Sequence, residues 1–201
     1  MMTACSFKKE INSNYYCQKL RFNCIQVDKV ISFKTSKGNF EVKLDGQNNP
    51  VTVSNFLENI NNNIYVNHKF YKIINYPQIK LIHGGVNPDN QLYSKENQTL
   101  NKAIPTIPLE IKFKEEKKPR YNYQITNPYE INYLINTFER GSIAMVKSGK
   151  NKSSSTEFFF VTNKFPELDG RYSIFGKVIR GLDVLEKINK EDYIKEVLIS
   201  N

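Results

Sequence analysis

Residues 141–176, with the sequence GSIAMVKSGKNKSSSTEFFFVTNKFPELDGRYSIFG, decide which fold the chain can adopt. Within them, Phe158, Phe159 and Phe160 form a short apolar run bounded by polar residues, which is typical of a buried strand. Successive side chains of a strand point to opposite faces, so the three rings must divide between two faces. One face can fill a core while the other lines a pocket. The stretch therefore predicts a sheet with a binding surface, but its periodicity does not identify the ligand.

The same alternation extends outward from this stretch. Apolar residues alternate with polar ones over 31–35 and 40–44, and a Ser-Lys-Gly-Asn turn separates the two runs, which predicts a β-hairpin with one buried face. Residues 50–59 carry apolar side chains at helical spacing and predict a helix that ends at the Asn triplet 61–63. The remaining expected elements are strands at 70–74, 80–82, 141–146, 157–162, 173–179 and 193–199, a helix at 182–189, and a loop at 87–100. About eight strands and two helices indicate a mostly β fold, and closing the sheet into a barrel would remove its exposed edges.

Size and composition point to one globular domain. The chain has 201 residues, 39% of them hydrophobic, with thirteen Phe and no Trp, which suggests a phenylalanine-rich core. No run of eighteen apolar residues occurs, so no membrane span is expected. The first residues also lack the apolar core of a secretory signal. The net charge of +9 is compatible with RNA or anionic lipid, but the lysines are scattered along the chain, so nucleic-acid binding is not expected as the main role.

Three cysteines, Cys5, Cys17 and Cys24, all fall near the N-terminus. Their spacing matches no common zinc pattern, and an odd number does not suit a disulfide framework. We therefore expect reduced thiols in an intracellular chain, and neither a metal nor a cofactor.

Two segments lie outside the regular pattern. Residues 1–28 show little periodicity and are interpreted as an N-terminal extension on a domain that covers residues 29–201. Residues 112–140 begin with a charge run and continue with tyrosines interleaved with asparagines. Charge runs usually face water, so we expect a solvated, partly ordered insert. A basic stretch beside aromatic residues could also stack on single-stranded RNA, and this alternative stays open.

Several motifs follow one another in an order that resembles the cyclophilins, the cyclosporin-binding peptidyl-prolyl isomerases. They are PVTVSNFL (50–57), FYKII (70–74), HGG (83–85), G-x-x-A-M (141–145), EFF (157–159), LDG (168–170), FGKV (175–178) and GLDVLEKI (181–188). The similarity covers roughly residues 29–200. The sequence TIPLEI at 106–111, the basic insert after it, and LDGRY at 168–172 look most like the cyanobacterial and plastid branch.

The resemblance implies a fold and an activity. The implied fold is mostly β, a closed eight-stranded antiparallel barrel capped by two helices, with an inserted segment and a ligand groove on its outside. The implied activity is peptidyl-prolyl cis-trans isomerisation assisting protein folding. This chemistry needs no nucleophile or metal, because rotation about the X–Pro bond only has to cross a barrier of ~18–20 kcal/mol set by amide resonance. It needs an apolar pocket for the proline ring, donors that hold the flanking backbone, and a cationic donor near the imide nitrogen.

Carrying the family's residues over gives a catalytic pair and a substrate-binding set. Lys72 falls at the position of the family's arginine, and His83 stands where a glutamine usually precedes Gly-Gly. Either could instead be structural: Lys72 as a solvated lysine at a strand end, His83 as a histidine with satisfied hydrogen bonds. The implied substrate-binding residues are Leu81, Met145, Val146, Lys147, Phe159, Leu168 and Tyr172. Met145 and Phe159 are expected to form the pocket floor and Leu168 its rim, although an isolated Met or Leu is more often ordinary core.

Departures from the family pattern predict a weaker enzyme. Lys72 offers a flexible, hydrated point charge in place of a planar guanidinium fork. By analogy with the loss of one preorganised donor, the rate could fall by about 10²–10³. Glu167 occupies a place where many members have Trp, so cyclosporin binding should be weak. Residues 75–80 make the segment longer than the family's and are expected to bulge at the groove edge.

Two other function classes remain open at this stage. The first is a non-catalytic scaffold that binds proline-containing segments with the same fold. The second is RNA association through residues 112–133. The expected partners are proline-containing polypeptides, with no membrane and with nucleic acid unlikely. We expect a monomer in the cytoplasm, or alternatively in a plastid-like organelle.

Overall fold

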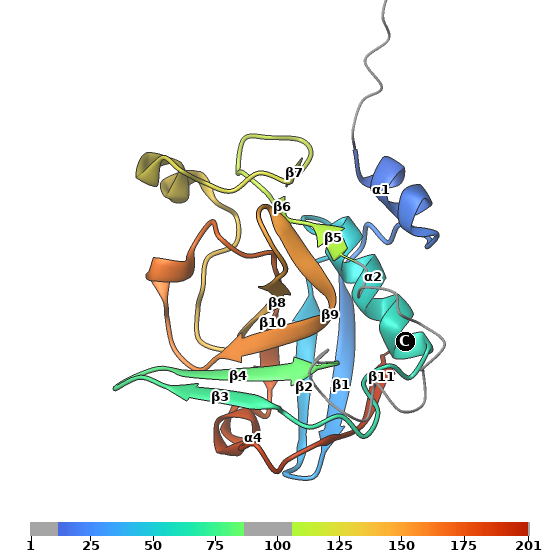
Figure 1. Cartoon of the computed structure of the whole chain (residues 1–201), viewed down its shortest axis with the longest axis vertical. Coiled ribbons are helices and arrows are strands. Elements are labelled where there is room, and N and C mark those ends of the chain that lie inside the picture. Colours follow the sequence, from blue (N-terminus) through green and yellow to red (C-terminus); the bar gives the residue numbers. More distant parts are fainter. Residues whose placement is uncertain (1–11, 87–105, 201) are drawn as a thin grey trace, which may run out of the picture.

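The computed structural model describes residues 12–86 and 106–200, and these form one large antiparallel sheet, one two-stranded sheet and short helices (Figure 1). The loop expected at residues 87–100 and Cys5 lie outside the described residues. The elements, in chain order, are α1 (Ser13–Leu20), β1 (Lys29–Thr35), β2 (Asn39–Leu44), α2 (Pro50–Asn61), β3 (Lys72–Asn75), β4 (Lys80–Gly85), β5 (Thr106–Pro108), β6 (Glu110–Ile111), β7 (Arg120–Tyr121), the 3₁₀ helix η1 (Pro128–Tyr133), β8 (Ser142–Lys147), β9 (Lys152–Val161), the 3₁₀ helix η2 (Pro166–Leu168), β10 (Ile174–Arg180), α4 (Leu182–Lys187) and β11 (Ile194–Ile199).

The large sheet has nine strands and curls around a core. Its strand order is β11-β1-β2-β10-β8-β9-β4-β3, with β5 paired to β9 beside this path. The two ends of the path are joined, within the described residues, by the isolated bridge between Lys69 and Tyr193 rather than by a continuous ladder. The mostly β antiparallel architecture is confirmed, whereas complete closure into a barrel is not. Among the residues that the structure describes, none forms a helix with the length and apolar character that a bilayer crossing requires.

The interior of the curled sheet is built from aromatic rings. Phe158 lies between Phe33, Phe56 and Tyr65, with ring centroids 5.9, 5.5 and 5.4 Å away, and Phe160 stands edge-on to Phe33 at 5.8 Å. Every one of these side chains is at most 1% exposed. Offset and edge-to-face ring pairs of this kind add to the hydrophobic stabilisation from burial. The expected phenylalanine-rich core is therefore present, and it lies on the inner face of the sheet.

Helix α2 covers one side of this core and contacts β9 and β11. Pro50 occupies its first turn, where a missing backbone N–H costs nothing. The carboxylate of Glu110 on β6 accepts hydrogen bonds from the backbone N–H groups of Val51 (3.2 Å) and Thr52 (2.8 Å) at the helix start. Burial nevertheless dominates and raises the pKa of Glu110 from 4.5 to about 7.

The raised pKa of Glu110 predicts how stability depends on pH. The native state binds the proton of the Glu110 carboxyl more tightly than the unfolded chain does. The stabilisation that comes from this protonation is therefore present at low pH and is lost as pH rises through 7. Between pH 5 and pH 8 we expect a loss of about 2–3 kcal/mol in the free energy of unfolding that Glu110→Gln does not show. Urea titrations of both proteins at the two pH values measure this difference. Parallel pH dependences of the two proteins would contradict the assignment.

The described part of the N-terminal arm, which begins at Asn12, is held by a disulfide. Helix α1 packs against α2, and Arg21, in the left-handed region at φ 64°, reverses the chain after the helix. This reversal brings Cys24 to a Cα–Cα distance of 5.5 Å from Cys17, and the two form a disulfide. The expectation of reduced thiols is therefore wrong for this pair. The sequence did not reveal the disulfide because the turn at Arg21, rather than the cysteine spacing, creates the proximity.

The insert is more ordered than its charge run suggests. Its Phe113, Ile125 and Leu134 form a separate apolar cluster with Leu109 and Ile111, which directly precede the insert. The guanidinium of Arg120 lies over the rings of Phe113 (4.3 Å) and Tyr123 (4.8 Å) and pairs with the carboxylates of Glu116 and Glu130. Lys114, Glu115, Lys117 and Lys118 remain exposed as expected. Lys112, the first residue of the charge run, is instead buried, so only the later part of the run forms the solvated outer side of a small packed subdomain.

Candidate active-site groove

The pairing register places the key residues in one row across four strands. Lys72 on β3 pairs with His83 on β4, His83 pairs with Phe159 on β9, and Phe159 pairs with Ala144 on β8. Because directly paired residues of an antiparallel sheet share a face, all four side chains project from the same side. This side is the outer face of the curled sheet, opposite to the aromatic interior.

A second row and two loops complete the apolar surface around Phe159. The next row contains Ile74, Leu81 and Val161, which are also paired across β3, β4 and β9. Phe138 stacks on Phe159 at 5.7 Å, and Tyr172 meets it edge-on at 5.1 Å. This apolar cluster, called the groove cluster below after the ligand groove that the family resemblance implies, comprises Leu81, Phe138, Ala144, Phe159, Val161 and Ile174 as buried members, with Ile74, Val146, Phe165, Leu168 and Tyr172 packed against them.

Most of the floor of this groove is covered by its own neighbours. Phe159 is 2% exposed and Leu81 is 5% exposed. The imidazole of His83 stacks on Phe159 with ring centroids 5.3 Å apart and planes 20° apart. The apolar surface open to a ligand therefore comes from the half-buried side chains of Val146, Leu168 and Tyr172 and from the His83 ring.

Lys72 and His83 differ sharply in electrostatic environment. Lys72 is exposed, and within residues 12–86 and 106–200 its ammonium group has neither a hydrogen bond nor an ion pair. His83 is half-buried, and burial followed by the charge of Lys72 lowers the pKa of its imidazole from 6.5 to about 4. At neutral pH the exposed ammonium of Lys72 thus lies beside a neutral imidazole. Tyr71, whose hydroxyl donates to Glu157 at 2.9 Å, meets the His83 ring edge-on with ring centroids 6.0 Å apart.

The loop that carries Leu168 and Tyr172 is held in place by contacts with Phe138 and with the insert. The carboxylate of Asp169 accepts a hydrogen bond from the backbone N–H of Phe138 at 2.7 Å. Gly170 adopts φ +71°, and a Cβ at this position would lie 2.6 Å from Ile125 Cδ1 of the insert. Only glycine combines this backbone conformation with so close an approach. The insert therefore supports the groove loop directly.

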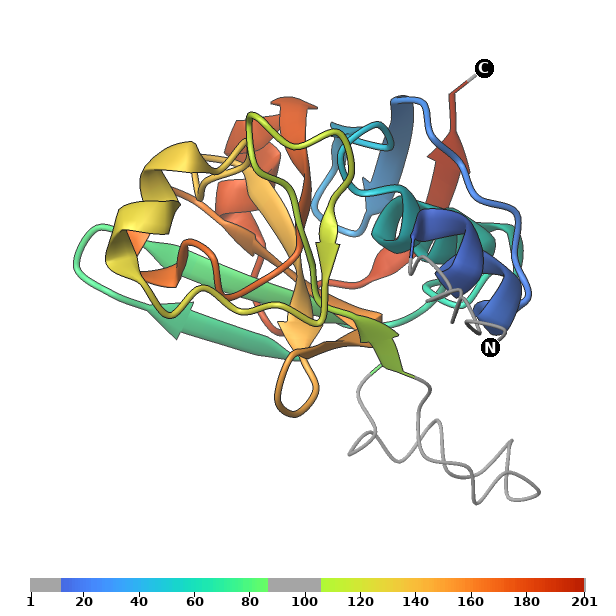
Figure 2. The same ribbon diagram turned by 90° about the horizontal axis from the view of Figure 1, so that it is seen from above.

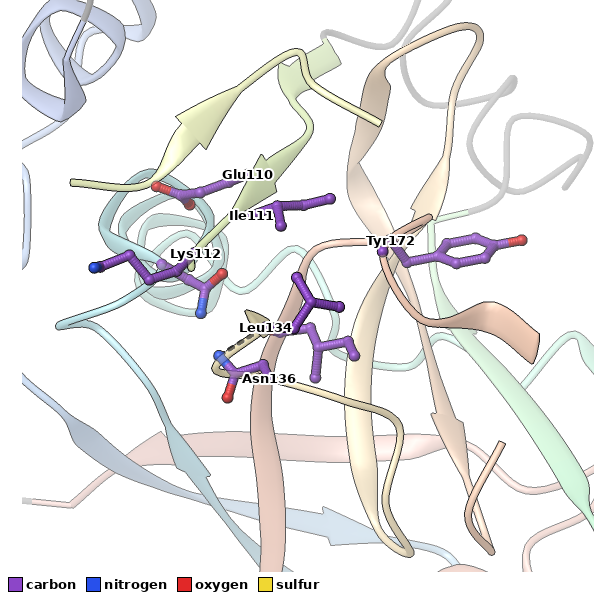
Figure 3. A pocket seen from close by; sticks show the side chains of 9 residues that line it. Glu110, Ile111, Lys112, Leu134, Asn136 and Tyr172 are labelled. Atoms are coloured by element: carbon purple, nitrogen blue, oxygen red, sulfur yellow. Dashed lines mark hydrogen bonds between the residues drawn. The ribbon is translucent and has the colours of Figure 1, made fainter. Parts of the chain in front are cut away.

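A small cavity of about 10 Å³ separates the groove loop from the start of α2. Figure 3 shows that the Tyr172 ring points away from Leu134 and Asn136, which line the cavity. Glu110 and Lys112 line the side of the cavity that is farther from Tyr172. Asn136 donates to the backbone carbonyl of Ile174 at 3.4 Å. Tyr172 thus borders the cavity with its backbone and directs its ring to Phe159. The cavity is no larger than one water molecule, so it offers no second ligand site.

Most residues expected at the site come together, and Met145 does not. Leu81, Val146, Phe159, Leu168 and Tyr172 all belong to the groove cluster. The expected role of Met145 in the pocket floor is corrected, because this side chain is fully buried in the interior core. The reason is strand alternation: Met145 pairs with Phe158 on the inner face, whereas Ala144 pairs with Phe159 on the groove face.

Lys147 lies at the end of β8, and its side chain is already engaged. Its ammonium donates to Gln124 Oε1 of the insert at 2.5 Å. Its side chain therefore anchors the insert, and only its backbone is left for an extended peptide. Substrate contact by Lys147, as by the other groove residues, stays a prediction.

Phe138 and Gln124 were missed as contributors to the groove. Both lie outside regular strands, so no periodicity marks them in the sequence. The one sequence feature that could have pointed to Phe138 is its position directly before Glu139-Arg140-Gly141, at the start of β8.

The longer segment after Lys72 forms a hairpin rather than an irregular bulge. Strands β3 and β4 pair from Lys72–His83 to Asn75–Lys80, and the Tyr76 N–H donates to the Ile79 carbonyl at 2.8 Å in the turn. The Tyr76 ring contacts Phe165, with centroids 5.6 Å apart. The extra residues therefore extend the groove edge, as expected, but in regular structure.

Comparisons with known proteins point to one family. Residues 30–200 match the family model for the cyclophilin type peptidyl-prolyl cis-trans isomerase/CLD domain. The chain is 30% identical over 164 residues to a peptidyl-prolyl cis-trans isomerase of Acinetobacter baylyi, covering 79% of this chain and 71% of the relative. It is 28% identical to a putative thylakoid lumen peptidyl-prolyl cis-trans isomerase of Synechocystis, covering 82% of this chain and 45% of the relative, which gives modest support to the cyanobacterial likeness.

Solved structures share the fold at low sequence identity. A cyclophilin type peptidyl-prolyl cis-trans isomerase of Cryptosporidium parvum superposes with a TM-score of 0.57 at 21% identity, covering 87% of this chain and 99% of that chain. The same protein crystallised in the presence of the dipeptide Ala-Pro gives a TM-score of 0.55 at 21% identity, covering 86% of this chain and 99% of that chain. A cyclophilin from Hirschia baltica superposes with a TM-score of 0.59 at 18% identity, covering 94% of this chain and 80% of that chain.

Proposed function

The chain belongs to the cyclophilin-type peptidyl-prolyl cis-trans isomerase family, and we propose that its groove catalyses X–Pro rotation at a rate limited by Lys72. The observation that carries the proposal is the row Lys72–His83–Phe159, which sets one free cation beside an apolar surface. The substrates would be proline-containing segments of polypeptides, and the protein would assist their folding.

The proposed mechanism uses only binding and electrostatics. As the X–Pro bond twists, amide resonance is lost and the imide nitrogen regains its lone pair. A donor that meets this nitrogen stabilises the twisted state more than either planar isomer, which lowers the barrier. Lys72 is the donor in this scheme. Leu168, Tyr172 and the His83 ring hold the proline, since Phe159 beneath them is covered.

Neutral His83 leads to a specific pH dependence. Because burial and Lys72 lower the pKa of His83 to about 4, kcat/KM should stay constant between pH 8 and pH 6 and fall only as pH approaches 4. Protonation there would place a second positive charge beside Lys72 and disturb the stacking on Phe159. His83→Gln should abolish this acidic limb in exchange rates measured by NMR. A midpoint near 6.5 in the wild-type profile would contradict the proposed environment.

A second candidate, a proline-binding scaffold without catalysis, is favoured by two observations. Phe159 is only 2% exposed, and the cation is an ammonium group rather than a guanidinium. NMR exchange spectroscopy on a short Ala-Pro peptide separates the two functions. Cross-peaks between cis and trans forms that grow with protein concentration support the isomerase. Shifted peptide resonances without exchange would support the scaffold instead.

The structure also supports proposals about the compartment of the protein and about its binding of cyclosporin. Disulfides persist in oxidising compartments and are rare in the cytosol, so Cys17–Cys24 favours an organelle lumen over the expected cytoplasm. Microscopy of the tagged chain tests this. Glu167, exposed at the groove loop in place of an aromatic residue, supports weak cyclosporin binding. We keep the proposal of a monomer, which sedimentation would test.

A further inference from the structure

Two walls of the groove separate from each other at one point of the structure. One wall is the end of β8, whose register with β9 shifts between Met145 and Lys147. The other is the groove loop, residues 168–172, which leads into Ser173. The backbone N–H of Met145 donates to the Ser173 carbonyl at 3.2 Å. Beyond this hydrogen bond, in the part of the chain that the structure describes, no hydrogen bond joins the end of β8 directly to the groove loop.

Two consecutive residues of the insert connect these walls. Gln124 accepts a hydrogen bond at its Oε1 from the ammonium of Lys147 at 2.5 Å. The next residue, Ile125, donates its backbone N–H to the carbonyl of Gly170 at 3.3 Å. Figure 2 shows the insert, in yellow, beside the orange segment that contains η2, and Figure 1 agrees. We call Gln124 and Ile125 the 124–125 bridge, because this one short segment contacts both walls.

The 124–125 bridge is held in one position. An ammonium group only donates, so it must meet the oxygen of the Gln124 amide, which fixes the orientation of that amide. Ile125 is 9% exposed and belongs to the apolar cluster that includes Phe113 and Leu134. Its side chain approaches Gly170 so closely that a Cβ there would lie 2.6 Å from it. Packing this tight transmits a displacement of the bridge to the groove loop.

The side chains next to these contacts are the ones that are open to a ligand. Val146 directly precedes Lys147, and Leu168 and Tyr172 lie two residues on either side of Gly170. All three are half-buried and pack against the groove cluster. Dispersion contacts weaken steeply when a gap of even 0.5–1 Å opens between two surfaces. The distance between the two walls therefore determines how well an apolar ring fits between them.

We propose that Gln124 and Ile125 are positioning residues for the isomerase reaction, because they set the distance between the end of β8 and the groove loop. This inference rests on the proposed function of the groove. The bridge acts through Lys147 and Gly170 rather than by touching the substrate. It controls binding more than bond rotation, since Lys72 lies on β3, three strands away from β8 in the row across the sheet.

The dissociation constant of a short Ala-Pro peptide, measured by NMR chemical-shift titration of the full chain, tests the proposal without depending on catalysis. Gln124→Ala and Ile125→Ala should each raise the Kd by about 2- to 30-fold, the range for residues that act on a site without contacting its ligand. Gln124→Glu, which keeps an acceptor for Lys147, and Ile125→Val, which keeps most of the packing, should bind as the wild type does. Exchange rates at saturating peptide should stay at the wild-type level in all four variants.

A matched control separates positioning from support of the fold. Ile131 packs against the same apolar cluster from η1. Ile131→Ala removes the same atoms as Ile125→Ala and should leave the Kd unchanged. Because Ile125 acts through the wall that carries Leu168, the losses in Ile125→Ala and Leu168→Ala should be less than additive in the double variant. The losses in Ile131→Ala and Leu168→Ala should simply add.

Several results would overturn the proposal. One is an unchanged Kd in both Gln124→Ala and Ile125→Ala. Another is a loss in Ile131→Ala as large as that in Ile125→Ala, because the insert would then only stabilise the fold. Additive losses in the double variant of Ile125 and Leu168 would also contradict it. If the wild type binds the peptide but does not accelerate exchange, the isomerase proposal fails and the Kd values still decide the role of the bridge. A wild type that does not bind the peptide would overturn both proposals.

Discussion

Replacing Lys72 with arginine is expected to raise the rate of X–Pro exchange by about 10²–10³-fold, the effect of one preorganised donor in an active site. The ammonium of Lys72 is a hydrated point charge on a flexible stem, and the structure gives it no partner among the described residues that would fix its direction. A guanidinium presents a rigid fork of donors. More of these donors would be aligned with the imide nitrogen as the bond twists.

The position can accept the larger side chain without repacking. Lys72 is exposed on β3, at an end of the sheet path, so an arginine would displace solvent rather than core atoms. Lys195→Arg, on the exposed face of β11, is the matched control for the change in side-chain type and should leave the exchange rate unchanged. An unchanged or lower rate for Lys72→Arg, measured by NMR exchange at equal protein concentration, would contradict the role given to this residue.

The second large effect concerns two neighbouring rings of β9. Phe158→Ala should lower the free energy of unfolding by about 3–5 kcal/mol, because its ring is fully buried and packs against Phe33, Phe56 and Tyr65. Phe159→Ala should cost less stability, since several of its neighbours are half-buried and can close around the gap. Its main consequence should be loss of isomerase activity, because the support for His83 and Tyr172 is removed.

Urea unfolding and exchange rates on the folded fraction separate the two variants. We expect Phe158→Ala to be the less stable protein and, where it is folded, the more active one. Phe159→Leu provides a smaller change at the groove position and should retain the fold. Equal activity losses in Phe158→Ala and Phe159→Ala would mean that the alternation of β9 does not separate core from groove.

The sequence predicted those elements that the spacing of their apolar residues determines. The hairpin at 31–44 is confirmed as β1 and β2, and the apolar stripe after Pro50 as α2. The triplet Phe158–Phe160 divides between interior and groove as its period requires. These features depend on contacts within one strand or helix, or between adjacent strands.

Features that depend on the path of the chain between elements were not predictable. The Cys17–Cys24 disulfide follows from the reversal at Arg21, and the packing of Ile125 against Gly170 follows from how the insert folds back. Met145 is a different case. The motif suggested a pocket role for both Met145 and Val146, yet consecutive residues of a strand face opposite sides, so the sequence already implied that only one of the two lines the groove.

The measurement that tests the account most directly is the cis–trans exchange rate of an Ala-Pro peptide with the wild-type protein and with Lys72→Gln, side by side. The account predicts acceleration by the wild type and a return to the uncatalysed rate in the variant, with both proteins folded. Acceleration that is unchanged in Lys72→Gln would show that the ammonium group of Lys72 does not catalyse rotation about the X–Pro bond.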